Sequence, residues 1–153
     1  MPKSLSAHFT LEELVFSQTA ARQHIDNSPS PDIVRNLTRL AAILEEVRDV
    51  LGGAPILVSS GYRSPVLNKA VGGAPDSYHK LGLAADFTAP KFGTVLQTAR
   101  AVARSKIAYH KVIFEFGRWV HIDIPVLNEI PTRTQLSIFE AGHYLDGIVS
   151  KPA

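Results

Sequence analysis

The chain has 153 residues, of which 45% are hydrophobic and 20% charged, and its net charge is only +2. This composition is typical of one globular domain over residues 1–153 and excludes a disordered protein. The absence of cysteine excludes disulfides and a cysteine-rich structural zinc site, and no apolar run is long enough to cross a bilayer.

Helix signals come first along the chain. Thr10 and Glu13 have the spacing of a capping box, which predicts a short helix that starts after Thr10. Pro31 occupies the position that helices prefer for their first residue, and Gly52 and Gly53 end the pattern. Between them the apolar residues recur at helical spacing, at Ile33, Leu37, Leu40, Ala41, Leu44, Val47 and Leu51.

Strand signals come mostly later. A short helix that begins at Ser64 and Pro65, and another over 93–105, separate the first strands from the rest. Strands are predicted over residues 56–60, 84–88, 111–116, 119–124, 135–140 and 144–148, the last of them at a sheet edge. Because helices come first and most strands late, we expect an α+β fold and not a doubly wound sheet.

The apolar pattern predicts a hairpin between two of these strands. Val112, Phe114 and Phe116 alternate with polar residues, as Val120, Ile122 and Ile124 do, so each set should face the core. This pairs Phe116 with Val120 across a three-residue turn and places Glu115 directly opposite His121. A two-residue turn would mix core and polar groups on one face, so we reject it.

Two histidines and one aspartate form the most informative pattern in the chain. His79 and Asp86 flank Gly82, which allows the chain to double back, and His121 follows on a predicted strand. Two imidazoles and one carboxylate suit a Zn2+ ion with one position open for water. Each of these residues alone is more commonly structural or exposed, so the prediction rests on their combination.

These motifs resemble the M15 zinc peptidases, which include D-alanyl-D-alanine carboxypeptidases and phage endolysins that cut peptidoglycan stem peptides. The resemblance extends from His8 to the strands after His121 and implies the fold of hedgehog signalling domains and DD-peptidases, an antiparallel sheet flanked by helices. It is carried by Ser59-Ser60-Gly61-Tyr62-Arg63-Ser64-Pro65, Asn68, Val71-Gly72-Gly73, Ser77-x-His79-x-x-Gly82-x-Ala84-x-Asp86, Glu115 and Trp119-Val120-His121.

The resemblance implies roles for these residues. Glu115 matches the general base of those members in which the base lies six residues before the last histidine. Other members have an acid three residues before it, and Arg118 stands there in this chain. Arg63 matches the arginine that binds or polarises the substrate, and Ser77 matches a serine beside the site. The implied zinc ligands are His79, Asp86 and His121.

Other residues near the motifs have two interpretations. Tyr62 and Trp119 either wall the substrate cleft or pack in the ordinary way. Asp123 either supports the site from behind or is an exposed strand carboxylate. No motif surrounds the remaining histidines, which are His8, His24, His110 and His143.

We therefore expect a zinc-dependent peptidase, a monomer, that acts on peptidoglycan peptides and has no nucleic-acid partner. The basic residues between 91 and 118 are interpreted as a solvated helix face or as attraction to a polyanion such as the wall. The first residues lack a secretory signal, so we expect synthesis in the cytoplasm and release to the wall by a holin-type pore, as for a phage endolysin. The alternatives are a zinc-stabilised module that binds wall peptide or protein without cutting it, and a phage-tail component.

Overall fold

The N-terminal helices begin where the capping residues stand. The computed structural model describes residues 2–153. Helix α1 (Leu11–Val15) has a complete capping box between Thr10 and Glu13, and α3 (Pro31–Val50) begins at its proline. A further helix, α2 (Gln18–Gln23), follows Ser17 and is absent from the predicted elements. None of the helices described between residues 2 and 153 combines the length and apolarity that a membrane span requires.

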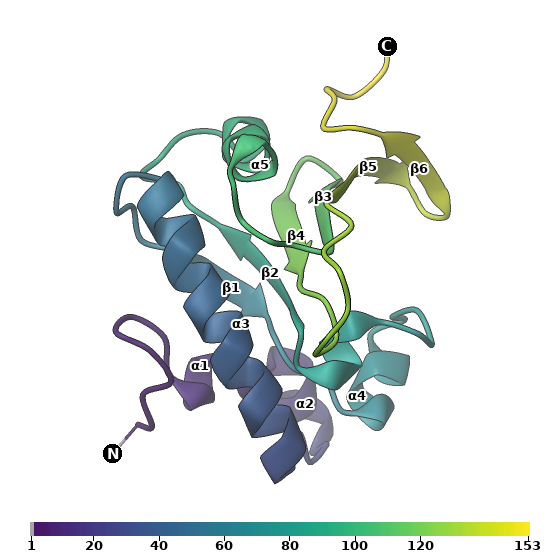
Figure 1. Ribbon diagram of the computed structural model, residues 1–153. Helices are drawn as coiled ribbons and strands as arrows, with labels where there is room; N and C mark the ends of the chain where they lie inside the picture. The colour runs from purple at the N-terminus through teal and green to yellow at the C-terminus, as the bar shows by residue number, and fades with distance from the viewer. Residues whose placement is uncertain (1) are drawn as a thin grey trace.

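Six strands form one sheet in the order β1-β2-β4-β3-β5-β6 (Figure 1). The strands are β1 (Leu57–Ser60), β2 (Ala84–Thr88), β3 (Lys111–Glu115), β4 (Trp119–Asp123), β5 (Thr134–Glu140) and β6 (His143–Asp146). The remaining helical elements are α4 (Pro65–Ala70), the 3₁₀ turn η1 (Tyr78–Leu81) and α5 (Val95–Arg104). The predicted α+β fold with helices flanking a mostly antiparallel sheet is therefore confirmed.

One strand pair departs from the antiparallel pattern, because β5 runs parallel to β3. After β4 the chain crosses back before β5 begins, and Thr134 donates its backbone N–H to the carbonyl of His110 at 2.9 Å. This contact places the start of β5 beside the start of β3, so the two strands run in the same direction. Strand β6 then pairs with β5 and forms the edge that the sequence predicts.

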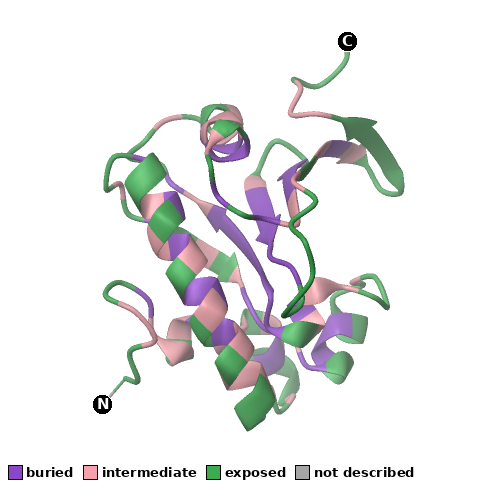
Figure 2. Cartoon of the chain, viewed as in Figure 1, coloured by how far each residue is buried: buried purple, intermediate pink, exposed green. Residues whose placement is uncertain are grey.

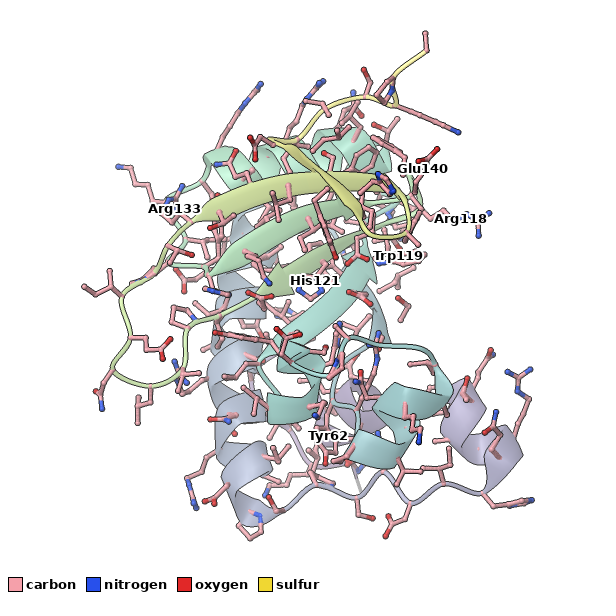
Figure 3. The ribbon with its side chains drawn as sticks, turned by 90° about the vertical axis from the view of Figure 1, so that its right-hand side faces the viewer. Tyr62, Arg118, Trp119, His121, Arg133 and Glu140 are labelled. Atoms are coloured by element: carbon pink, nitrogen blue, oxygen red, sulfur yellow. The ribbon has the colours of Figure 1, made fainter. Side chains whose placement is uncertain are left out.

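The two faces of the sheet have different characters. The apolar side chains of β2, β3 and β4 pack with α3 and α5 into the main core, and Figure 2 shows buried residues along these strands. Because side chains alternate along a strand, the polar residues of the same strands point to the opposite face. That second face carries Asp86, Glu115, Trp119, His121 and Asp123, and Figure 3 shows Trp119 and His121 on it.

The register of the β3–β4 hairpin corrects the predicted one by two residues. Glu115 pairs with Trp119 and Ile113 with His121, so Glu115 lies diagonally across from His121 and not directly opposite. The reason is Phe116, which leaves the strand for the turn with a φ of +57° and donates its N–H to Ile138 of β5. The prediction that Phe116 faces the core is therefore wrong, since its ring is exposed and lies against Trp119. An even shift leaves the other strand residues on their predicted faces, so Glu115 and His121 still share one face.

Candidate metal centre and active site

Neighbouring strands and one tight turn bring the three predicted ligands together. Asp86 of β2 pairs directly with His121 of β4. His79 arrives from η1, which ends at Gly82 with a φ of +72°. A Cβ at Gly82 would meet Ile33 of α3 at 3.1 Å, so both the backbone angle and the packing favour glycine there. The ligand atoms of the two histidines and the aspartate all lie within 4.8 Å of one another.

The distances within this cluster fit a metal ion. His79 Nε2 lies 3.3 Å and His121 Nδ1 lies 3.0 Å from Oδ1 of Asp86. Tetrahedral zinc with bonds of about 2.0–2.2 Å holds neighbouring ligand atoms about 3.3–3.6 Å apart, so the cluster needs only a small adjustment to hold the ion. All three side chains are buried, which keeps competing water from the ligand atoms.

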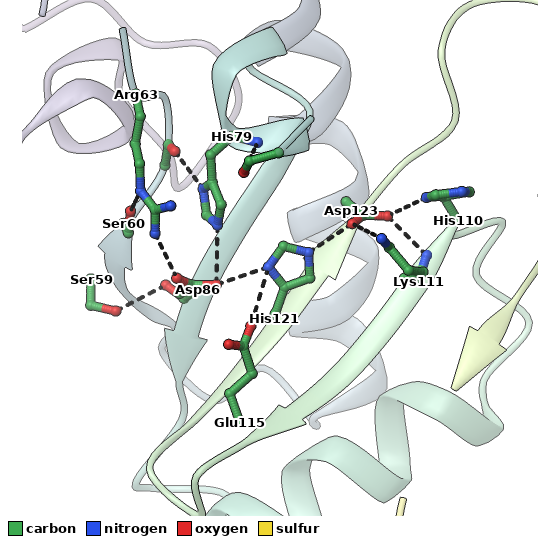
Figure 4. Close-up of polar contacts among 12 residues, drawn as sticks. Ser59, Ser60, Arg63, His79, Asp86, His110, Lys111, Glu115, His121 and Asp123 are labelled. Carbon is green, nitrogen blue, oxygen red and sulfur yellow. Dashed lines mark hydrogen bonds and ion pairs between the residues drawn. The ribbon is translucent and has the colours of Figure 1, made fainter. Parts of the chain in front are cut away.

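Each imidazole is also held from behind. Nδ1 of His79 lies 2.7 Å from the carbonyl oxygen of Gly61, and Nε2 of His121 lies 2.7 Å from Oδ2 of Asp123 (Figure 4). A carbonyl oxygen only accepts, so Nδ1 of His79 carries the proton and Nε2 presents a lone pair to the cluster. Metal-binding histidines are oriented in this way in proteins, and the donor set therefore fits a divalent cation.

In the metal-free cluster, a proton on His121 supplies the positive charge that a metal cation would otherwise provide. Burial alone would raise the pKa of Asp86, but the charges and hydrogen bonds of His79 and His121 hold it well below its usual range. Burial would likewise lower the pKa of His121, but hydrogen bonds to Asp123 and Asp86 raise it to about 10. Without a metal, a protonated His121 thus lies between two carboxylates and supplies the positive charge that they require.

Glu115 lies next to the cluster but is not one of its three ligand residues. Its Oε1 is 3.5 Å from Nδ1 of His121, and its side chain is 20% exposed. Burial, and then the negative charge of Asp86, raise the pKa of Glu115 to about 7. The positive charges of His121 and Arg63 act in the opposite direction and lower the pKa of Glu115. The indole N–H of Trp119 is buried and has no partner in hydrogen-bonding geometry. A carboxylate with a pKa near neutrality can both take and return a proton.

Arg63 lies behind the cluster, where each of its nitrogen atoms has an acceptor within the protein. Nε donates to Ser60 at 3.1 Å, one Nη donates to Asn68 at 3.3 Å, and the other lies 3.4 Å from Oδ2 of Asp86. The guanidinium therefore fixes the outer oxygen of Asp86 while Oδ1 faces the histidines. Sequence reasoning assigned Arg63 to the substrate and missed this contact with a predicted ligand.

Sequence reasoning left two interpretations open for Asp123 and gave His110 no role. Asp123 is 1% exposed, so it is the buried support and not the exposed strand carboxylate. Its Oδ1 lies 2.6 Å from Nδ1 of His110, and the ring of His110 stacks on Tyr78 at 4.6 Å. The signal was present in the sequence, since His121 and Asp123 are two residues apart on one strand and must share a face.

A groove of about 530 Å³ opens beside the cluster, between the α1–α2 corner, α4 and β1. We call it the Arg63 groove. It is lined by Phe16, Ser17, Gln18, Thr19, Val58, Ser59, Ser60, Tyr62, Arg63, Leu67, Val71, Asp86 and Trp119. Because Asp86 belongs to the lining, a molecule bound in the groove would lie beside the cluster.

The other two predicted substrate residues, Tyr62 and Ser77, make contacts within the protein. Tyr62 touches the groove but is only 7% exposed and packs in the main core, and Figure 3 places it far from His121. Ser77 does not line the groove. Its hydroxyl accepts the backbone N–H of His79 at 3.2 Å and so caps η1. Its observed contact therefore positions a ligand.

Residues 7–123 match the family model of Peptidase M15. A search of curated proteins found no match. The matched segment contains the whole cluster, Glu115 and Arg63, and it covers well over half of the 153 residues. The chain therefore belongs to the peptidase M15 family.

Proposed function

We propose that the protein is a zinc-dependent peptidase that hydrolyses amide bonds in peptidoglycan stem peptides or their cross-links. The observation that carries the proposal is Glu115, a carboxylate with a raised pKa beside a buried cluster of two histidines and one aspartate. His79, Asp86 and His121 would hold the zinc ion. When bound, zinc polarises the substrate carbonyl and lowers the pKa of water.

The side chains around the cluster have distinct parts in this reaction. Glu115 takes a proton from the attacking water and returns it to the leaving amine, which is general acid–base catalysis. Arg63 holds the outer oxygen of Asp86 and directs its remaining N–H groups toward the Arg63 groove, where they stabilise negative charge on the substrate. Trp119 bounds the groove next to Glu115, and Asp123 keeps His121 in orientation.

The proposal includes the setting in which the enzyme works. We propose a monomer with one domain over residues 1–153 that acts on the cell wall as a phage-type endolysin, after release through a pore that another protein forms. The lining of the Arg63 groove combines polar and apolar side chains, which suits the binding of a short peptide segment.

Purified peptidoglycan tests the proposal directly. The zinc-loaded protein should release new amino and carboxyl groups from wall peptides, and a chelator should abolish the release until zinc is restored. Mass spectrometry of a defined muropeptide mixture would identify the bond. Intact muropeptides after incubation with the zinc-loaded protein would contradict the proposal and favour a binding module without catalytic activity.

A further inference from the structure

A second hollow, of about 350 Å³, lies at the β3–β4 turn. We call it the turn hollow. It is lined by Phe116, Arg118, Trp119, Phe139 and Lys151. Phe116 lies against Trp119 with ring centroids 5.8 Å apart, so the two aromatic rings form one wall. Because Trp119 also lines the Arg63 groove, the turn hollow and the groove meet at this residue.

The turn hollow has two cations and no acid in its lining. Within residues 2–153, neither Arg118 nor Lys151 has a carboxylate oxygen within 4.0 Å. Glu140 lines a neighbouring hollow together with Lys151 but forms no ion pair with it. Both cations are exposed, and Figure 3 shows Arg118 at the turn beside Trp119. Their charges are therefore free for a ligand.

The contrast with Arg63 strengthens this point. All three nitrogen atoms of Arg63 already donate to Ser60, Asn68 or Asp86. Only two of its five N–H groups remain for a substrate, and the negative charge of Asp86 beside them opposes the binding of a full carboxylate there. In the turn hollow it would meet two unpaired cations, and a guanidinium suits carboxylates because it can donate two parallel hydrogen bonds.

We infer that the turn hollow is a subsite for a carboxylate of the peptide substrate. The inference rests on the proposed function. Trp119 and His121 are two residues apart on β4, which corresponds to about 7 Å along a strand. An extended peptide advances about 3.3–3.6 Å per residue, so the carboxylate lies about two residues from the bond that is cut. The aromatic wall packs against the aliphatic part of the residue that bears it.

Binding to an inactive variant tests the subsite apart from turnover. The zinc-loaded E115Q protein is titrated calorimetrically with a muropeptide stem peptide in three forms: all carboxylates free, the C-terminal one amidated, and the internal ones amidated. We expect one amidated form to bind about three- to twentyfold more weakly, since each exposed ion pair contributes up to about fivefold. Which amidation weakens binding identifies the carboxylate as internal or terminal.

Removing the cations should have the same effect. Adding R118Q and K151Q should weaken binding of the free form by that factor and abolish the preference over the amidated form. Adding K91Q, which removes an exposed charge elsewhere, should change neither. Equal binding of all three forms, or a preference that survives R118Q and K151Q, would overturn the inference. Hydrolysis by the unmodified protein is measured separately, so failure of the proposed function is recognised independently.

Discussion

The two histidines of the cluster are supported in different ways, although they face the same aspartate. On the η1 side, His79 is held by a main-chain carbonyl, that of Gly61, which no substitution removes. On the β4 side, His121 is held by the Asp123 side chain, which is itself held by His110. One side therefore depends on backbone geometry and the other on a chain of side chains. The difference predicts which variants damage the metal site and how severely.

The largest effect should come from Glu115, which supports neither histidine. E115Q should lower kcat by about 10²- to 10⁴-fold, because the proton acceptor is lost while the three ligands remain. Zinc content, measured by metal analysis, should stay at that of the unmodified protein. The matched control is E46Q, which removes a carboxylate from the exposed side of α3. Undiminished turnover in E115Q would show that another group is the base.

On the β4 side, the contact between Asp123 and His121 can be removed by one substitution. D123N should weaken zinc affinity about 10- to 100-fold, because the amide is a poorer acceptor for the N–H of His121 and carries no charge. Competition with a chromogenic chelator measures the affinity. The control D49N, on an exposed position of α3, should bind zinc normally. Unchanged affinity in D123N would mean that strand geometry alone orients His121.

The sequence predicts some of these contacts and not others, because only contacts within one strand follow from a local pattern. Alternation along a strand depends on local pattern, so the faces of Glu115 and His121 were predictable even though Phe116 shifted the register by two. The same alternation predicts that Asp123, two residues after His121, lies on the same face and can contact it. The parallel β3–β5 pair and the contact between Arg63 and Asp86 join segments far apart in the chain, and no local pattern encodes them.

The η1 side should respond most to changes that affect the backbone of the turn. G82A should destabilise the protein by about 1–2 kcal/mol, since an alanine there must adopt the left-handed region and its Cβ crowds Ile33. Chemical denaturation measures the loss, and zinc affinity should fall with it because η1 carries His79. G142A in the β5–β6 turn has a similar φ of +80° but open space around it, so it isolates the backbone cost. Equal losses in both variants would leave no role for packing against α3.

Zinc should oppose the pH dependence that the metal-free protein shows. In the metal-free protein the pKa of His121 is raised from 6.5 to about 10, so its contribution to stability is complete below pH 6.5 and is lost as pH rises to 10. Glu115, with a pKa raised from 4.5 to about 7, acts in the same direction between those values. Unfolding of chelator-treated protein should become easier by up to tenfold per pH unit over these ranges.

Zinc binding offsets this trend, because the metal requires deprotonated ligands and its affinity rises with pH. The zinc-loaded protein should therefore gain stability relative to the metal-free protein from pH 6 to pH 9. Parallel denaturation curves of the two forms over this range check the signs. A metal-free protein whose stability rises across the same range would contradict a charged His121 between the two carboxylates.

The smallest effect on zinc affinity is expected at His110, which contacts Asp123 but not His121. H110F keeps an aromatic ring to stack on Tyr78 but removes the contact with Asp123. Asp123 retains the backbone N–H of Lys111 at 3.0 Å and the ammonium of Lys111 at 3.9 Å, so zinc affinity should fall only about two- to fivefold. Combining H110F with D123N should add nothing, because His110 reaches His121 only through Asp123. Additive losses would mean that His110 acts on the site by a separate route.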